Sequence, residues 1–97
     1  MKVTVARIYV TEGKHTHEKI FERLHDEHQV KGVTVYRGIT GFGKSGETHS
    51  SALLDVSFDL PVVVEFFDTD DKIKAALEAI SDLIVPGHVL TFAADCS

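Results

Sequence analysis

Residues 32–49 read GVTVYRGITGFGKSGETH, and this stretch decides how the rest of the chain is interpreted. It begins as a β-rich run, continues into closely spaced glycines and ends in a polar segment. Glycines let a ligand approach the backbone and expose N–H groups toward it. The stretch therefore predicts a strand that leads into a small-molecule site.

The same stretch contains GITGFGKS, Gly38 to Ser45, a formal match to the phosphate-loop pattern G-x-x-x-x-G-K-[ST]. A phosphate loop lies between a strand and a helix whose N-terminus receives the phosphate, within a fold of several βαβ units. A chain of 97 residues is short for that fold, and residues 46–61 show no apolar stripe of helical spacing. A phosphate-loop nucleotide hydrolase is therefore the less favoured alternative.

Strand and helix patterns alternate along the whole chain. Period-two or continuous apolar patterns predict four strands, at residues 3–10, 33–42, 62–67 and 89–93. Apolar stripes of helical spacing predict two helices, one over residues 15–29 and one from the acidic run at residues 68–71 to residue 84. The order βαββαβ predicts an α+β, ferredoxin-like fold: residues 1–97 form one domain, an antiparallel four-stranded sheet with two helices on one face. The other face of such a sheet is uncovered, and in a domain this small we expect it to mediate self-association.

Composition excludes several classes of partner. The formal net charge is -5, with 15 acidic and 10 basic residues, which argues against a nucleic-acid partner. The chain has no apolar run near the roughly 20 residues that cross a bilayer and no signal-peptide core, so we expect a cytoplasmic protein. The single cysteine, Cys96, has no partner for an internal disulfide.

Six histidines raise the question of a metal site. His15 and His17 are two residues apart and would not share a helical face, whereas His25 and His28 are three apart and would lie side by side on a helix. Structural zinc sites usually have four ligands, often cysteines at short spacing, and that pattern is absent from the sequence. We predict no metal site.

No nucleophile–base–acid set can be assembled either, which predicts that the protein is not an enzyme.

The order of elements and the stretch at residues 32–49 resemble the PII-type signalling proteins. The resemblance is closer to the uncharacterised PII-like family called domain of unknown function 190, and it covers essentially the whole chain. The residues that carry it are Ile8-Tyr9, Glu12, Gly32-Val33-Thr34-Val35, Arg37-Gly38, Gly41-Phe42-Gly43, His49 and Asp59-Leu60-Pro61.

This resemblance implies a site and an assembly. PII-type proteins are homotrimers that bind adenine nucleotides in clefts between subunits, and the loop after their second strand docks on a transporter, enzyme or regulator. The resemblance implies that residues 44–54 form this mobile loop. Arg37 and Lys44 are the best cations for a ligand anion, although Arg37 could equally form an intersubunit salt bridge. The predicted ligand-binding residues are Arg37, Gly41, Phe42, Gly43, Lys44 and His49.

Two differences from PII-type proteins bear on the ligand. PII proteins carry a glycine-rich turn with a lysine before the last strand, whereas this chain has only residues 85–88 there, and it stops at Ser97 without their C-terminal arginines. Both differences argue against triphosphate binding. The predicted function is a trimeric, non-enzymatic sensor that binds AMP, ADP, ATP or a similar anionic metabolite and regulates a transporter or enzyme. A ligand-free structural interaction module is the alternative.

Overall fold

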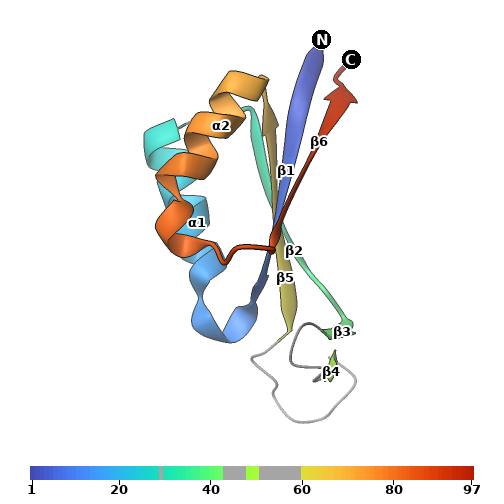
Figure 1. Ribbon diagram of the computed structural model, residues 1–97. Helices are drawn as coiled ribbons and strands as arrows, with labels where there is room; N and C mark the ends of the chain where they lie inside the picture. Colours follow the sequence, from blue (N-terminus) through green and yellow to red (C-terminus); the bar gives the residue numbers. More distant parts are fainter. Residues whose placement is uncertain (29, 43–47, 51–59) are drawn as a thin grey trace.

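The structure is a computed structural model that describes residues 1–28, 30–42, 48–50 and 60–97. An antiparallel four-stranded sheet is packed on one face by two helices, as predicted (Figure 1). The sheet order is β2-β5-β1-β6, so β2 and β6 form its edges. Its strands are β1 (Lys2–Thr11), β2 (Gly32–Arg37), β5 (Pro61–Asp68) and β6 (Val89–Asp95).

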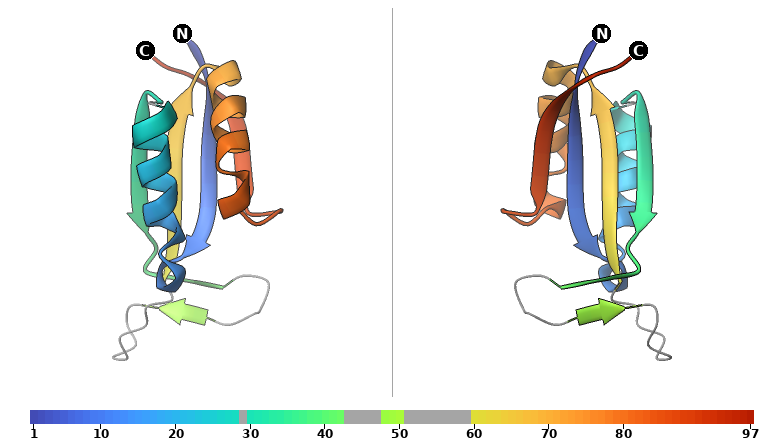
Figure 2. Two further views of the ribbon diagram at one scale, coloured as in Figure 1. Left: turned by 90° about the vertical axis from the view of Figure 1, so that its left-hand side faces the viewer. Right: turned by 90° about the vertical axis from the view of Figure 1, so that its right-hand side faces the viewer.

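The two helices share the sheet between them. Helix α1 (Thr16–Arg23) lies over the β2 side and helix α2 (Asp70–Ala79) over the β1–β6 side, which leaves the far face open (Figure 2). Short 3₁₀ turns, η1 (Glu12–Lys14) and η3 (Ser81–Leu83), precede α1 and follow α2. Neither α1 nor α2, nor any other helix in the described ranges, is long and apolar enough to cross a bilayer.

The core follows from strict alternation along β5. Val62, Val64 and Phe66 are buried toward the helices, and the residues between them face the open side of the sheet. The fully buried apolar residues form one cluster between sheet and helices: Ala6, Ile8, Ile20, Leu24, Val64, Phe66, Ile73, Ala76 and Ile80. The predicted helical stripe through Ile73, Ala76 and Ile80 therefore packs as expected.

The prediction of one strand over residues 33–42 is wrong. Strand β2 ends at Arg37, and residues 40–42 form a separate strand, β3 (Thr40–Phe42), paired with β4 (Thr48–Ser50). The cause is the length of the partner strand: Arg37 pairs with Val62, and β5 begins only one residue earlier, at Pro61. The chain then leaves the main sheet, because no β5 residue remains for it to pair with.

The first helix is also shorter than predicted. His15 has the left-handed backbone conformation (φ 55°), so α1 starts at Thr16. It is regular only to Arg23, and residues 24–28 continue as a π-helix.

The last strand, in contrast, runs two residues further than predicted, to Asp95, because Lys2 and Asp95 are paired across β1 and β6.

Asp68, the first residue of the acidic run expected to start the second helix, is instead the last residue of β5. It is 1% exposed at the end of β5, where its carboxylate accepts the backbone N–H groups of Lys31 (3.1 Å) and Thr69 (2.7 Å). The carboxylate therefore joins the start of β2 to the start of α2. Asp70 and Asp71 do occupy the first turn of α2, where their charge suits the helix dipole.

Arg23 connects the end of α1 to the turn after α2. Its guanidinium donates to the Ala79 carbonyl (3.0 Å) and to the Asp82 carboxylate, and the bond from Arg23 lowers the pKa of the Asp82 carboxyl. A lowered carboxyl pKa adds stability that is present above the unfolded-state pKa and is lost as the pH falls through the folded-state pKa.

We predict that Asp82→Asn flattens the acid side of the stability profile. The urea midpoint of the variant should fall less than that of the wild-type protein between about pH 5 and pH 2, where aspartate titrates. Glu78→Gln, which removes an exposed carboxylate from α2, is the matched control. Parallel curves for Asp82→Asn and the wild-type protein would contradict the prediction.

Candidate functional site

The ends of β1, β2 and β5 meet at one corner of the sheet. The Glu12 N–H donates to the Leu60 carbonyl (2.9 Å), and the Gly38 N–H donates to the Pro61 carbonyl (2.6 Å). The Arg37 guanidinium forms an ion pair with the Glu12 carboxylate. We call Glu12, Arg37, Gly38, Leu60 and Pro61 the strand corner. It fixes both ends of the segment between β2 and β5 at one place in the fold (Figure 1).

Arg37 is the cation of the strand corner. It shares the helix-side face of β2 with Val33 and Val35, because the three residues pair with Phe66, Val64 and Val62. Its side chain is 66% exposed, whereas that of Glu12 is 16% exposed. The contact with Glu12 occupies one Nη of a guanidinium that has five N–H donors, so the group can bind an anion as well. The salt bridge that forms here lies within one chain.

Two other predicted site residues are brought together by the hairpin of β3 and β4. Gly41 is the register partner of His49, and Phe42 is the partner of Thr48. The Phe42 side chain is 77% exposed. Residues 48–50, predicted as part of a loop, thus form a strand. Gly43, Lys44 and most of the predicted mobile loop at 44–54 lie outside the described residues.

The glycines of this region pack closely against Pro61. A Cβ atom at Gly38 would lie 2.7 Å from the Pro61 ring and 3.2 Å from its carbonyl oxygen. At Gly41 the corresponding distance to the ring is 3.2 Å. Glycine at position 38 therefore permits the close approach of β2 to the start of β5.

We predict that Gly38→Ala destabilises the protein and that Gly41→Ala does so less. The Gly38 methyl would overlap a proline ring that cannot rotate away, so we expect a loss of about 1–3 kcal/mol. Urea unfolding at a fixed protein concentration measures both variants. Equal stability of Gly38→Ala and the wild-type protein would show that the corner relaxes without cost.

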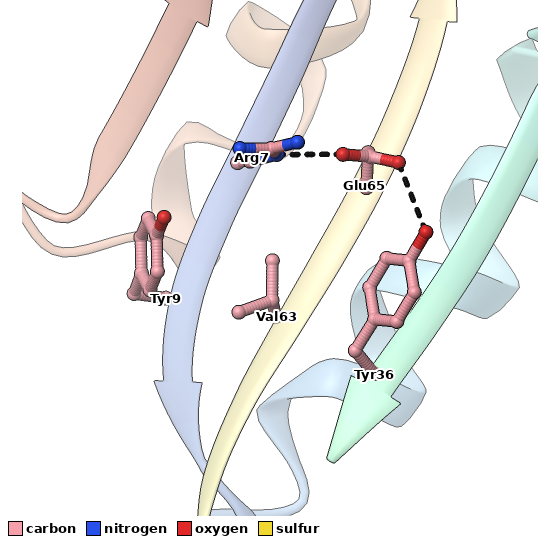
Figure 3. A pocket seen from close by; sticks show the side chains of 5 residues that line it. All are labelled: Arg7, Tyr9, Tyr36, Val63 and Glu65. Carbon is pink, nitrogen blue, oxygen red and sulfur yellow. Dashed lines mark hydrogen bonds and ion pairs between the residues drawn. The ribbon is translucent and has the colours of Figure 1, made fainter. Parts of the chain in front are cut away.

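A second candidate region is a hollow of about 210 Å³ on the open face of the sheet (Figure 3). Arg7 Nε donates to Glu65 Oε1 (2.6 Å), and the Tyr36 hydroxyl donates to Glu65 Oε2 (3.2 Å). The bond to Glu65 also raises the pKa of Arg7. The three side chains come from three adjacent strands, and Tyr9 and Val63 complete the lining.

Apolar side chains surround this charged pair. Tyr36, Leu90 and Phe92 are 51%, 53% and 41% exposed on the open face, and the Arg7 guanidinium lies 5.0 Å from the centre of the Phe92 ring. An exposed apolar surface of this kind is typical of a face that another surface covers. The sequence predicted an uncovered face but not this pair. Period-two spacing in the sequence indicates which face of its strand Arg7 or Glu65 occupies. Only the strand register shows that the two residues lie opposite each other.

No group of three or more histidine, cysteine or carboxylate side chains in the described ranges could hold a metal ion. The rings of His15 and His17 do come together, with centroids 6.3 Å apart, because His15 precedes the helix in its left-handed conformation. The assumption that residues two apart stay separate applies within a helix, and His15 lies just before the helix begins.

Comparison with known proteins adds relatives and fold neighbours. The family model DUF190, described as Uncharacterized ACR, COG1993, matches residues 2–95. A UPF0166 protein of Aquifex aeolicus is 38% identical over 85 residues, which cover 82% of this chain and 80% of that protein. The UPF0166 protein MJ1524 of Methanocaldococcus jannaschii is 27% identical over 100 residues, covering 99% of this chain and 91% of that protein.

Two solved structures are similar in fold at low sequence identity. CPII from Thiomonas intermedia K12, in a structure bound to ADP and bicarbonate, superposes with a TM-score of 0.66 at 23% identity, covering 99% of this chain and 87% of that chain. The divalent cation tolerance protein CutA1 from Thermus thermophilus has a TM-score of 0.62 at 17% identity, covering 100% of this chain and 85% of that chain. At these identities the likeness shows the fold.

Proposed function

This chain belongs to the DUF190 family, and on that premise we propose that it is a non-enzymatic, ligand-responsive regulatory protein. Its ligand is an adenine nucleotide, such as AMP, ADP or ATP, or a similar anionic metabolite. The observation that carries the proposal is the exposed guanidinium of Arg37 at the strand corner, next to the glycine-containing hairpin. The likeness in fold to CPII, a PII-like protein described as bound to ADP and bicarbonate, supports this class of ligand.

In this proposal the subunits assemble through the open face of the sheet. A homotrimer that packs its sheet faces together would bury the apolar ring around Arg7 and Glu65, which a single copy leaves in water. Residues at the edge of the open face of one subunit would then lie near the strand corner of the next. Ligand-binding clefts between subunits follow from this arrangement.

Each predicted site residue has a role in the proposal. Arg37 and Lys44 supply positive charge for the ligand anion, and Gly41 and Gly43 let it approach the backbone. Phe42 offers an exposed ring for an adenine base, and His49, the register partner of Gly41, would supply a polar contact from β4. The segment at residues 44–54 would carry the ligand state to a transporter or enzyme.

The strands on either side of Lys44 argue against the phosphate-loop alternative. Residues 40–42 and 48–50 are both strands, whereas a phosphate loop leads directly into a helix. The ligand-free interaction module stays as the second candidate function, because the apolar open face alone would suit it. The cytoplasmic location stays a prediction.

A thermal-shift screen with AMP, ADP, ATP and bicarbonate tests the proposal. A ligand at a hundredfold excess over its dissociation constant adds about 2.7 kcal/mol of stability, which raises the melting temperature by several degrees. We expect a shift with at least one nucleotide, and a reduced shift in Arg37→Met but not in Lys72→Met, a matched change of an exposed cation on α2. If no compound raises the melting temperature, the ligand-free interaction module is favoured. If the protein releases phosphate from ATP in the presence of magnesium, the phosphate-loop hydrolase is favoured instead.

A further inference from the structure

A groove of about 330 Å³ lies between the end of α1 and the start of β2. Helix α1 covers the β2 side of the sheet (Figure 2), and the groove shares no lining residue with the hollow around Arg7 and Glu65. Its volume falls at the lower end of the range that small-molecule pockets occupy. The side chains that line it are Phe21, Leu24, His25, Val30, Lys31 and Val33. None of them belongs to the strand corner or the β3–β4 hairpin.

The backbone at one wall of this groove departs from regular geometry. Helix α1 changes at Leu24 into a π-helix that runs to His28, and Leu24 and His25 both face the groove. Turns of π-helix are rare and occur frequently at functional sites. Leu24 is fully buried, so it forms a dry apolar floor, while Phe21 and His25 stand at the rim.

The walls suit a flat, apolar body. The rings of Phe21 and His25 are one helical turn apart and nearly parallel, at an angle of 7° with centroids separated by 6.3 Å. Both residues line the groove. Val30 and Val33 supply the opposing aliphatic surface. Aromatic ligands gain most from such a combination, because ring contacts add to the burial of apolar area.

One cation, the Lys31 ammonium, lines the groove. The Lys31 ammonium contacts the Met1 thioether sulfur at 2.7 Å and forms no ion pair with any residue in the described ranges. A thioether is a weak acceptor, so the ammonium keeps donors for an anion. The Asp26 carboxylate, next to His25 in the chain, is engaged by His25 Nδ1 at 3.0 Å, and Asp68 is buried against the Lys31 backbone N–H.

We propose that this groove binds a small aromatic carboxylate, with the ring between the Phe21–His25 wall and the two valines and the carboxylate on the Lys31 ammonium. The site is separate from the nucleotide site of the proposed function, and either can exist without the other. A side chain of a partner protein is the competing occupant. It differs in needing no carboxylate, so the anion dependence distinguishes the two.

Titration with 1-naphthoate, followed by two-dimensional NMR of the whole protein, tests the proposal. We expect saturable shifts at Phe21, His25 and Lys31 and weaker binding of 1-naphthalenemethanol, which has the same rings without the charge. Lys31→Met should weaken naphthoate binding about fivefold, the upper range for one partly exposed ion pair. Phe21→Ala should weaken both compounds about tenfold, as expected for the loss of an aromatic contact with its buried area.

Lys19→Met is the matched control, because it removes an exposed lysine from α1 that does not line the groove. It should leave naphthoate binding unchanged. The proposal is overturned by shifts confined to Tyr9, Tyr36 and Phe92 on the open face, by equal effects of Lys31→Met and Lys19→Met, or by no saturable binding at millimolar naphthoate. Equal binding of the acid and the alcohol would assign the groove to an uncharged partner side chain instead.

Discussion

Arg7→Glu should convert the assembled protein into single chains. The substitution places a second carboxylate against Glu65 in the middle of the open face, where the wild-type guanidinium donates a 2.6 Å hydrogen bond. Like charges that are forced together in a buried interface cost several kcal/mol, enough to dissociate a micromolar complex. The chain mass is 10.7 kDa, so sedimentation should show the wild-type protein at roughly three times this mass.

The compensating change makes this prediction specific. The double variant Arg7→Glu, Glu65→Arg restores an oppositely charged pair across β1 and β5, where the two residues are register partners. It should recover at least part of the assembly. Lys72→Glu, an equal reversal of charge on the exposed side of α2, should leave the mass unchanged. A wild-type protein that sediments as a single chain at micromolar concentration would contradict this account of the open face.

Phe66→Ala should have the largest effect on the stability of the fold. Phe66 is 0% exposed, and it packs at the centre of the cluster that joins the sheet to both helices. Replacing a buried phenylalanine by alanine costs about 3–5 kcal/mol through lost burial and the cavity left behind. For a domain of this size that loss is a large share of the total free energy of unfolding.

Urea unfolding at one fixed protein concentration measures this loss, and Phe42→Ala supplies the comparison. Phe42 is 77% exposed on β3, so its truncation should change the urea midpoint little. The two phenylalanines differ in burial and not in chemistry. A similar midpoint for both variants would mean that the helices do not pack on this face of β5.

The sequence predicted the fold wherever the local pattern and the tertiary partner agree. The apolar run at β5 reads as a central strand, and it occupies a central position between β2 and β1. Its near-continuous apolar pattern does not distinguish the two faces of the strand, and the structure shows that Val62, Val64 and Phe66 face the helices. The single strand expected over residues 33–42 failed for a non-local reason. Most of its residues favour extended structure, apart from Gly38 and Gly41, and the point where β5 begins, at Pro61, determines where it leaves the sheet.

In the candidate site, too, some features follow from the local sequence and others depend on tertiary contacts. Glycine spacing drew attention to Gly38 and Gly41, and both lie close to Pro61 in the structure. The contact between Arg37 and Glu12 joins residues 25 positions apart and depends on how two strand ends meet. The pairing of Arg7 with Glu65 spans 58 positions and depends on strand register. Periodicity places a residue on a face, and register then selects its neighbour.

Binding of ADP to the assembled and the dissociated protein tests the central claim most directly. Titration calorimetry compares the wild-type protein with Arg7→Glu at the same protomer concentration, after circular dichroism has shown that both are folded. The account predicts saturable ADP binding by the wild-type protein and binding at least about tenfold weaker by the dissociated variant, because the cleft lies between subunits. ADP binding of equal affinity in both proteins, or none in the assembled wild-type protein, would contradict it.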